Sequence, residues 1–301
     1  MTSAPPTAVT AGLVQSMIVA AQRRVLDGIG RAVGTEVVYL KAAWADPVLY
    51  GGRGERTGGD IDILVRPGAV VAFAGRLEAQ GYRLFWPPWQ RATILIGNHA
   101  WVYQPPPGWL PVDLHLGLAD PPWFSLPVAE CLDRAIVYDS VDGPILSLCP
   151  EDQILHAAAH YANHAYTIDG RHLGDVERLC TERRLDWGGV WERARQGGLE
   201  VPLALLTQAL SARGMALPVA ARPCGVLTAL CIARSKAWVA TAPELRRKGP
   251  LTRTYDKLAR FPFLSNRSAA LPRYLARYAF VRLADVALEL AYKLGEESQP
   301  R

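Results

Sequence analysis

Two aspartates inside an apolar run are the feature that most limits how this chain can fold. Residues 60–65 read Asp-Ile-Asp-Ile-Leu-Val, and a short apolar run of this kind is typical of a buried strand. Alternate side chains of a strand point the same way, so Asp60 and Asp62 should project from one face. Neighbouring carboxylates repel one another and lose solvation on burial, so the run predicts a cation beside them. Because Mg²⁺ and Mn²⁺ prefer carboxylate oxygens, we expect a divalent metal site here.

A third acid, Asp113, lies in a second strand-like run over residues 110–118. We expect its carboxylate to lie within metal-bridging distance of Asp60 and Asp62, although Asp113 is far from them in the sequence. Replacing Asp62 by Asn should then leave stability unchanged or slightly raised, because it relieves repulsion between like charges. The alternative interpretation is a strand end that simply exposes its acids to solvent.

Length and composition favour a globular protein with a large core. The chain has 301 residues, half of them hydrophobic, which is enough for two domains and argues against disorder. Its five cysteines include no Cys-x-x-Cys pair, so neither a disulfide framework nor a zinc ribbon is indicated and a reducing, cytoplasmic location is expected. No apolar run reaches the roughly 18 residues of a membrane-spanning helix, so membrane insertion is not expected.

The order of predicted elements indicates an α/β (α+β) fold. We expect a core formed by a mixed sheet with flanking helices, followed by an all-helical C-terminal domain. The predicted domains are a disordered tail over residues 1–10, a catalytic domain over residues 11–149, and a helical domain over residues 150–301 that completes the cleft. Segment 51–59, with its many glycines, is expected to be a flexible loop. Strands are predicted at residues 36–43, 60–65, 82–86, 93–103 and 110–118, and helices from residue 13 to about residue 29 and at residues 70–80.

Several phrases, taken in order, resemble a known enzyme superfamily. A strand and turn, a loop, a strand with Asp-x-Asp and a later strand with a third Asp are similar to the polymerase-β-like nucleotidyltransferases. Within that superfamily the local phrases resemble a poorly characterised bacterial nucleotidyltransferase family, over roughly residues 36–180. The phrases are Tyr-Leu-Lys-Ala-Ala at 39–43, Leu-Tyr at 49–50, Arg56, the run 60–65, Val-Asp-Leu-His at 112–115 and Leu-Cys-Pro-Glu-Asp at 148–152.

The resemblance implies metal-dependent phosphoryl chemistry at the three aspartates. Asp60 and Asp62 would hold the metal bound to a nucleoside triphosphate, and Asp113 would join them around a second metal that activates the acceptor hydroxyl. Lys41 would contact the triphosphate as a single positive charge, and Arg56 would donate two parallel hydrogen bonds to it.

One position departs from the family pattern. Ala42 stands where the resemblance leads us to expect a glycine that touches the triphosphate. Alanine still presents its backbone N–H, but it disfavours positive φ.

Two histidines complete the set of candidate site residues. His115 follows the third acid by two residues and is a candidate contact for phosphate or acceptor. His160 belongs to a helical series, His156, His160 and His164, and is a candidate to position the nucleotide from the helical domain. A zinc role is not indicated because the His-Glu-x-x-His pattern is missing, and helix packing is the alternative.

The basic surplus of the chain lies in its C-terminal fifth. The whole chain carries a net charge of +5, whereas residues 240–301 contain 12 Lys and Arg against 6 Asp and Glu. We expect this segment to select the acceptor, with a small molecule or peptide favoured over RNA because the surplus is modest. The basic cluster consists of Arg246, Arg247, Lys248, Arg253, Lys257 and Arg260.

The sequence therefore predicts transfer of a nucleoside monophosphate from an NTP to a hydroxyl acceptor, with release of pyrophosphate and with Mg²⁺ or Mn²⁺ as cofactor. Phosphoryl or pyrophosphoryl transfer on the same scaffold is one alternative. The other alternative is a catalytically silent nucleotide-binding or interaction module. Aspartates that are paired in salt bridges and do not bind a metal would favour this alternative.

Overall fold

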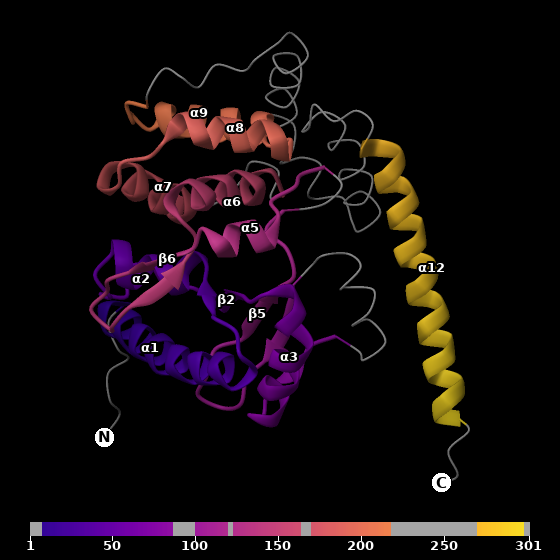
Figure 1. Ribbon diagram of the computed structural model, residues 1–301. Helices are drawn as coiled ribbons and strands as arrows, with labels where there is room; N and C mark the ends of the chain where they lie inside the picture. The colour runs from indigo at the N-terminus through magenta and orange to yellow at the C-terminus, as the bar shows by residue number, and fades with distance from the viewer. Residues whose placement is uncertain (1–7, 87–99, 120–122, 164–169, 218–269, 298–301) are drawn as a thin grey trace, which may run out of the picture. The chain divides into compact units, whose positions relative to one another are not determined.

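A computed structural model describes residues 8–86, 100–119, 123–163, 170–217 and 270–297 (Figure 1). Its internal contacts divide the chain into two compact units. The first unit comprises the described residues of Met1–Gly117, Pro127–Cys149 and Val281–Arg301, and the second those of Leu118–Leu126 and Pro150–Phe280.

A five-stranded mixed sheet forms the centre of the first unit. Its strand order is β1-β2-β5-β4-β3, with β2 and β5 parallel and the other neighbours antiparallel. This arrangement confirms the predicted mixed sheet and the α+β fold class. The strands are β1 (Val38–Tyr39), β2 (Ile61–Leu64), β3 (Arg83–Leu84), β4 (Trp101–Gln104) and β5 (Val112–His115).

The register of the two parallel strands determines which polar residues meet. Asp62 of β2 pairs with Asp113 of β5, and Leu64 pairs with His115. Strand β2 is buried throughout, whereas β5 alternates between buried and half-buried residues. Asp113 and His115 are the half-buried residues of β5, and because they are two positions apart they share one face of the sheet. The sheet therefore gathers three polar side chains on a single face.

Helices α1 (Ala8–Val33), α2 (Lys41–Leu49) and α3 (Val70–Ala79) pack around this sheet (Figure 1). Apolar residues at helical spacing explain the length of α1, and Leu26 is fully buried. Helix α1 ends where Gly34 takes a positive φ of 72°, which suits a glycine at a helix C-terminus. It begins at Ala8, so residues 8–10 are helical rather than part of the predicted tail, and residues 1–7 lie outside the described part.

A β-hairpin that the sequence did not reveal closes the first unit. It consists of β6 (Ile136–Tyr138) and β7 (Ile145–Ser147), and it follows the short helix α5 (Val128–Asp133). The hydroxyl of Ser147 donates a hydrogen bond of 2.5 Å to the backbone oxygen of Tyr39, so the hairpin is fastened to the edge strand β1.

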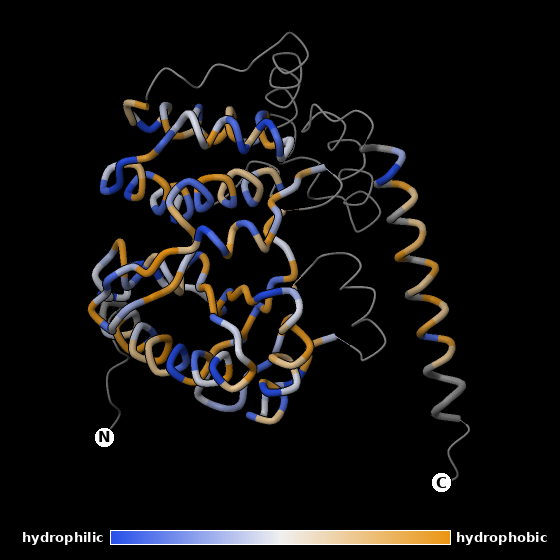
Figure 2. Tube along the Cα trace, viewed as in Figure 1, coloured by the Kyte–Doolittle hydropathy of each residue, from blue (hydrophilic) through white to orange (hydrophobic). Residues whose placement is uncertain are grey.

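From Pro150 to residue 217 the described part of the second unit is mainly helical, as the sequence predicted. Figure 2 shows hydrophobic and hydrophilic positions alternating along these helices, the pattern that amphipathic packing produces. Arg193 Nη1 donates to the buried Asp152 at 2.8 Å and so ties two of them together. The helices are α6 (Pro150–Asn163), α7 (Gly170–Glu182), α8 (Trp187–Gly197) and α9 (Glu200–Ala212).

Beyond residue 217 the described part of the chain consists of one long helix, α12 (Ala270–Glu297). The predicted basic cluster at residues 246–260 lies outside the described residues. Among the helices described, none combines the length and apolar character needed to cross a membrane.

Candidate active site

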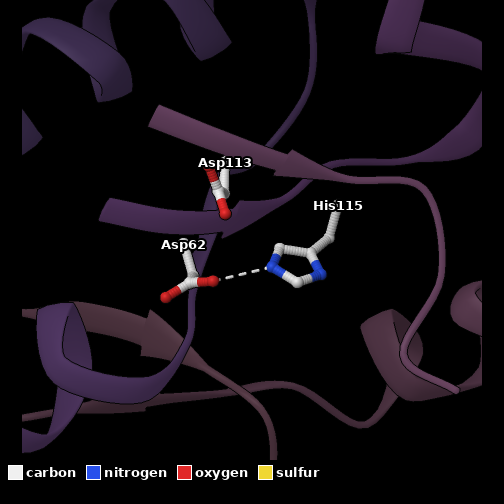
Figure 3. A group of neighbouring side chains, drawn as sticks. All are labelled: Asp62, Asp113 and His115. Atoms are coloured by element: carbon white, nitrogen blue, oxygen red, sulfur yellow. Dashed lines mark hydrogen bonds and ion pairs between the residues drawn. The ribbon is translucent and has the colours of Figure 1, made fainter. Parts of the chain in front are cut away.

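Three side chains from β2 and β5 come together as potential metal ligands (Figure 3). One ligand atom from each of Asp62, Asp113 and His115 lies within 4.8 Å of the other two, and among the described side chains no other group of this kind occurs. The structure thus brings together Asp62 and Asp113, as the sequence predicted. His115 completes this group, and Asp60 is not a member of it.

Asp62 is the most enclosed acid of the site, being only 2% exposed. Lys41 Nζ donates to Asp62 Oδ1 at 2.5 Å, and His115 Nε2 lies 2.7 Å from the same oxygen. Burial on its own would raise the pKa of Asp62, but the charge of Lys41 and the hydrogen bond with His115 outweigh it and hold that pKa well below its usual value. Asp62 is therefore a carboxylate at any physiological pH.

The pKa values of Asp113 and Asp60 are shifted in the opposite direction, above their usual range. Burial, followed by the negative charges of Asp62 and Asp60, raises the pKa of Asp113 to about 6. Burial and the charge of Asp62 also raise the pKa of Asp60. Burial would lower the pKa of Lys41, but Asp62, with smaller contributions from Asp60 and Asp113, raises it above its usual value. Burial and repulsion between the carboxylates thus both disfavour the charged forms of Asp60 and Asp113, and Lys41 offsets this only in part.

Lys41 and Ala42 form the first turn of α2, directly after strand β1. Lys41 has a φ of 47° and is the non-glycine residue with positive φ in the described part of the chain. The left-handed conformation therefore falls on Lys41, and Ala42 does not have to adopt it. The residue before the helix, Leu40, provides no side-chain cap, so the first backbone N–H groups of α2 are left for another acceptor. This removes the conformational objection to alanine at position 42.

The glycine-rich segment 51–59 is held by helix α1, which corrects the expectation of a flexible loop. Gln15 Nε2 donates to the backbone oxygen of Gly58. Gly12 and Gly54 approach so closely that a Cβ atom on Gly12 would lie 2.4 Å from the oxygen of Gly54. Only glycine permits this contact between helix and loop.

The same helix also orders Arg56 through a buried acid that the sequence did not single out. Ser16 Oγ donates to Asp46 Oδ2 at 2.5 Å, and the backbone N–H of Arg56 donates to Asp46 Oδ1 at 3.1 Å. Arg56 is 4% exposed, and its Nη1 donates to the backbone oxygen of Thr57 at 3.0 Å. A single aspartate in a helical segment carries no sequence signal, which is why Asp46 was missed.

A small cavity of about 20 Å³ is lined by residues of α1, α2 and the glycine-rich segment. Ala42, Arg56 and Asp60 all contribute to its wall, together with Asp46 and Gly58. Two predicted triphosphate contacts and one predicted metal ligand therefore line a common space.

His160 belongs to α6 in the second unit. Its ring centroid lies 6.4 Å from that of His156 and 5.0 Å from that of His172 on α7. The third histidine of the predicted series, His164, lies outside the described residues. The nucleotide-positioning role of His160 stays a prediction.

Solved structures with a similar fold include two of the antibiotic-resistance factor ANT(2'')-Ia. The solution structure has 16% sequence identity and a TM-score of 0.38, covering 67% of this chain and 93% of that chain. The crystal structure with adenylyl-2''-tobramycin has 15% identity and a TM-score of 0.39, covering 65% and 98%. An antigenic nucleotidyltransferase-like protein from Paracoccidioides brasiliensis has 12% identity and a TM-score of 0.41, covering 66% and 90%.

No curated protein matches the sequence significantly. The model of one protein family does match, over residues 10–213, and that family is described as uncharacterised nucleotidyltransferase. The match includes Lys41, Arg56, Asp62, Asp113 and His115, and it confirms the resemblance identified from the sequence. Because it covers more than half of the chain, the protein belongs to this family of nucleotidyltransferases.

Proposed function

We propose that this nucleotidyltransferase moves a nucleoside monophosphate from an NTP to a hydroxyl acceptor in a reaction that needs a divalent metal. The observation that carries the proposal is the pairing of Asp62 with Asp113 across two parallel strands. Burial, followed by the negative charges of Asp62 and Asp60, raises the pKa of Asp113 to about 6, so a cation beside these carboxylates would stabilise their charged forms.

The residues present fit Mg²⁺ or Mn²⁺. Carboxylate oxygens are ligands that both ions accept, and a divalent cation would stabilise the charged forms of Asp60 and Asp113, whose pKa values are raised by burial and by neighbouring carboxylates. Asp60 and Asp62 would hold the ion that accompanies the triphosphate, and Asp113 would join them for the second ion. When bound, such ions lower the pKa of the attacking hydroxyl and stabilise charge that develops on the phosphate oxygens.

The chain's own groups bind and orient the nucleotide. The first turn of α2, with the N–H of Ala42, offers uncapped donors for phosphate oxygens. Lys41 supplies a point charge to the triphosphate, and Arg56 lines the same cavity as Ala42 and Asp60.

The reaction follows in-line displacement at the α-phosphorus. The acceptor oxygen forms a bond to the α-phosphorus while the bond to the bridging oxygen on its β-side breaks, and pyrophosphate leaves with that oxygen. Asp113, as the third carboxylate beside the acceptor hydroxyl, assists removal of its proton. The acceptor is a small molecule or a peptide, favoured over RNA.

One observation supports the alternative of a nucleotide-binding module without catalysis. Lys41 already forms an ion pair with Asp62, and a closed aspartate set was the feature expected of such a module. The pKa values argue against it, because Lys41 does not offset the burial and the repulsion that raise the pKa of Asp113. Membership of a nucleotidyltransferase family also favours the enzyme.

Position-specific labels test the proposal. The protein is incubated with Mg²⁺ or Mn²⁺, acceptor fractions containing small molecules, peptides or RNA, and NTP labelled at the α- or the γ-phosphate. Nucleotidyl transfer places the α-label on the acceptor and the γ-label in pyrophosphate. A γ-label on the acceptor without the α-label would establish phosphoryl or pyrophosphoryl transfer instead. Binding of NTP with no label transferred to any fraction would favour the silent module.

A further inference from the structure

His115 lies where a ligand of the same ion as Asp62 and Asp113 would lie. Its side chain follows Asp113 by two positions on β5 and so shares that residue's face of the sheet. Nε2 is 2.7 Å from Asp62 Oδ1, and the side chain is 15% exposed. The three ligand atoms are within 4.8 Å of one another, while Asp60 is not in this group.

One of these separations matches that of two atoms that share one metal ion. Two ligands at about 2.1 Å from an ion and at right angles to one another are about 3 Å apart. The observed 2.7 Å between Asp62 Oδ1 and His115 Nε2 is close to that value. An ion bound between these two atoms would also displace Lys41 Nζ, which lies 2.5 Å from the same oxygen. Strands β2 and β5 fix both backbones, and this limits how far either side chain can move away.

We propose that His115 binds the second metal ion directly through Nε2, with Asp62 and Asp113 as its partners, in the position that an all-carboxylate site would give to Asp60. This rests on the metal-dependent function proposed above. An imidazole is a ligand for first-row transition metals, whereas Mg²⁺ demands oxygen ligands. The site therefore selects Mn²⁺ or a later transition-metal ion over Mg²⁺.

Pulsed electron paramagnetic resonance of the full chain with Mn²⁺ alone, without nucleotide, tests the ligand directly. Coordination by His115 produces a ¹⁴N coupling to the bound Mn²⁺. Uniform labelling with ¹⁵N-histidine should convert it to a ¹⁵N coupling, and His115→Asn should abolish it. His172→Asn is the matched control, because it removes a histidine of the second unit and should leave the coupling intact.

Selectivity provides a second readout. In His115→Asp the group becomes three carboxylates, so the ratio of Mn²⁺ to Mg²⁺ affinity, measured by titration, should fall roughly tenfold or more. Circular dichroism and melting temperature verify that each variant folds, and the ¹⁵N experiment needs no variant at all.

The outcomes separate this inference from the proposed function. Mn²⁺ that binds without nitrogen coupling, or an unchanged affinity ratio in His115→Asp, overturns the ligand role and leaves His115 as a hydrogen-bond partner of Asp62. If label transfer continues in that case, the nucleotidyl transfer stands. If wild-type protein binds no Mn²⁺ at all, this inference fails, and the transfer assay alone decides whether the function fails with it.

Discussion

Lys41 Nζ lies 2.5 Å from Oδ1 of Asp62, within the group of side chains that would hold a metal. Lys41 reaches this position from a left-handed backbone conformation, which for a non-glycine residue costs on the order of 1 kcal/mol. The contact therefore has to be favoured by the surrounding charges. A metal ion bound to Asp62 would compete with Lys41, and we propose that the displaced lysine then contacts the triphosphate.

We expect Lys41→Met to destabilise the metal-free protein and to strengthen its metal binding. Removing one partner leaves Asp62 buried and charged, which should lower the free energy of unfolding by about 2–4 kcal/mol. The increase in melting temperature caused by Mn²⁺ should be larger than in the wild type, because no lysine competes. NTP affinity should fall. Thermal unfolding with and without Mn²⁺, and nucleotide titration, measure these three effects.

Arg53→Met is the matched control for that variant. It removes the same charge from the nearby glycine-rich segment, but Arg53 is largely exposed and pairs only loosely with Glu55, at 3.9 Å. Surface pairs of this kind contribute little. Equal behaviour of the Lys41 and Arg53 variants would show that the ion pair with Asp62 is energetically silent.

Asp62→Asn should abolish metal-dependent transfer and also destabilise the protein. The sequence alone led us to expect unchanged or raised stability, because it showed repulsion between acids but not the two partners of Asp62. With Lys41 and His115 both directed at Oδ1, an amide leaves Lys41 without its counter-charge. We expect a loss of about 2–4 kcal/mol in chemical denaturation without metal. A melting temperature at or above that of the wild type would support the repulsion argument instead.

Asp113→Asn should have the opposite effect on stability, and the effect should depend on pH. The pKa of Asp113 is about 6 in the folded protein against an ordinary value of 3.8. A carboxyl whose pKa is raised by folding loses its contribution to stability as pH rises from the unfolded value through the folded one. The variant cannot ionise at this position, so its free energy of unfolding should rise relative to that of the wild type between about pH 4 and pH 6. Above pH 6 the variant should remain about 1–3 kcal/mol more stable than the wild type.

Denaturant unfolding from pH 4 to pH 8 with a chelator measures this difference. Metal-dependent transfer by Asp113→Asn should be lost at every pH. A stability difference that does not change with pH would mean that Asp113 does not titrate in this window.

The sequence predicted the parts of the site that depend on periodicity. Apolar runs located β2 and β5, and the parallel pairing of these strands places Asp113 opposite Asp62. His115 was singled out because it follows the third acid in the sequence, as a candidate contact for phosphate or acceptor rather than as a metal ligand.

Contacts between distant segments could not be predicted in the same way. The ion pair of Lys41 with Asp62 depends on a left-handed turn at Lys41, and no local pattern signals this turn for a lysine. The loop over residues 51–59 looks flexible by composition, yet α1 holds it through Gln15 and through the close approach of Gly12 to Gly54. Some of these glycines are needed for contact rather than for mobility.

Two adjacent glycines in that loop provide the sharpest test of this point. A Cβ atom at Gly58 would lie 2.8 Å from Cβ of Ala42 and 3.3 Å from the backbone oxygen of Asp60, whereas one at Gly59 would meet nothing within 4 Å. Since Cβ of Ala42 cannot rotate away, Gly58→Ala must shift either the loop or the first turn of α2. We expect a loss of about 1–3 kcal/mol in unfolding free energy, together with weaker NTP binding, because Gly58 and Ala42 line the same cavity.

Gly59→Ala is the control, since it adds the same methyl group one residue along without a collision. It should match the wild type in both melting temperature and NTP affinity. If Gly58→Ala binds NTP as tightly as Gly59→Ala although its stability is reduced, the first turn of α2 is not part of the nucleotide site. The triphosphate would then have to be held by Lys41 and Arg56 without the backbone N–H of Ala42.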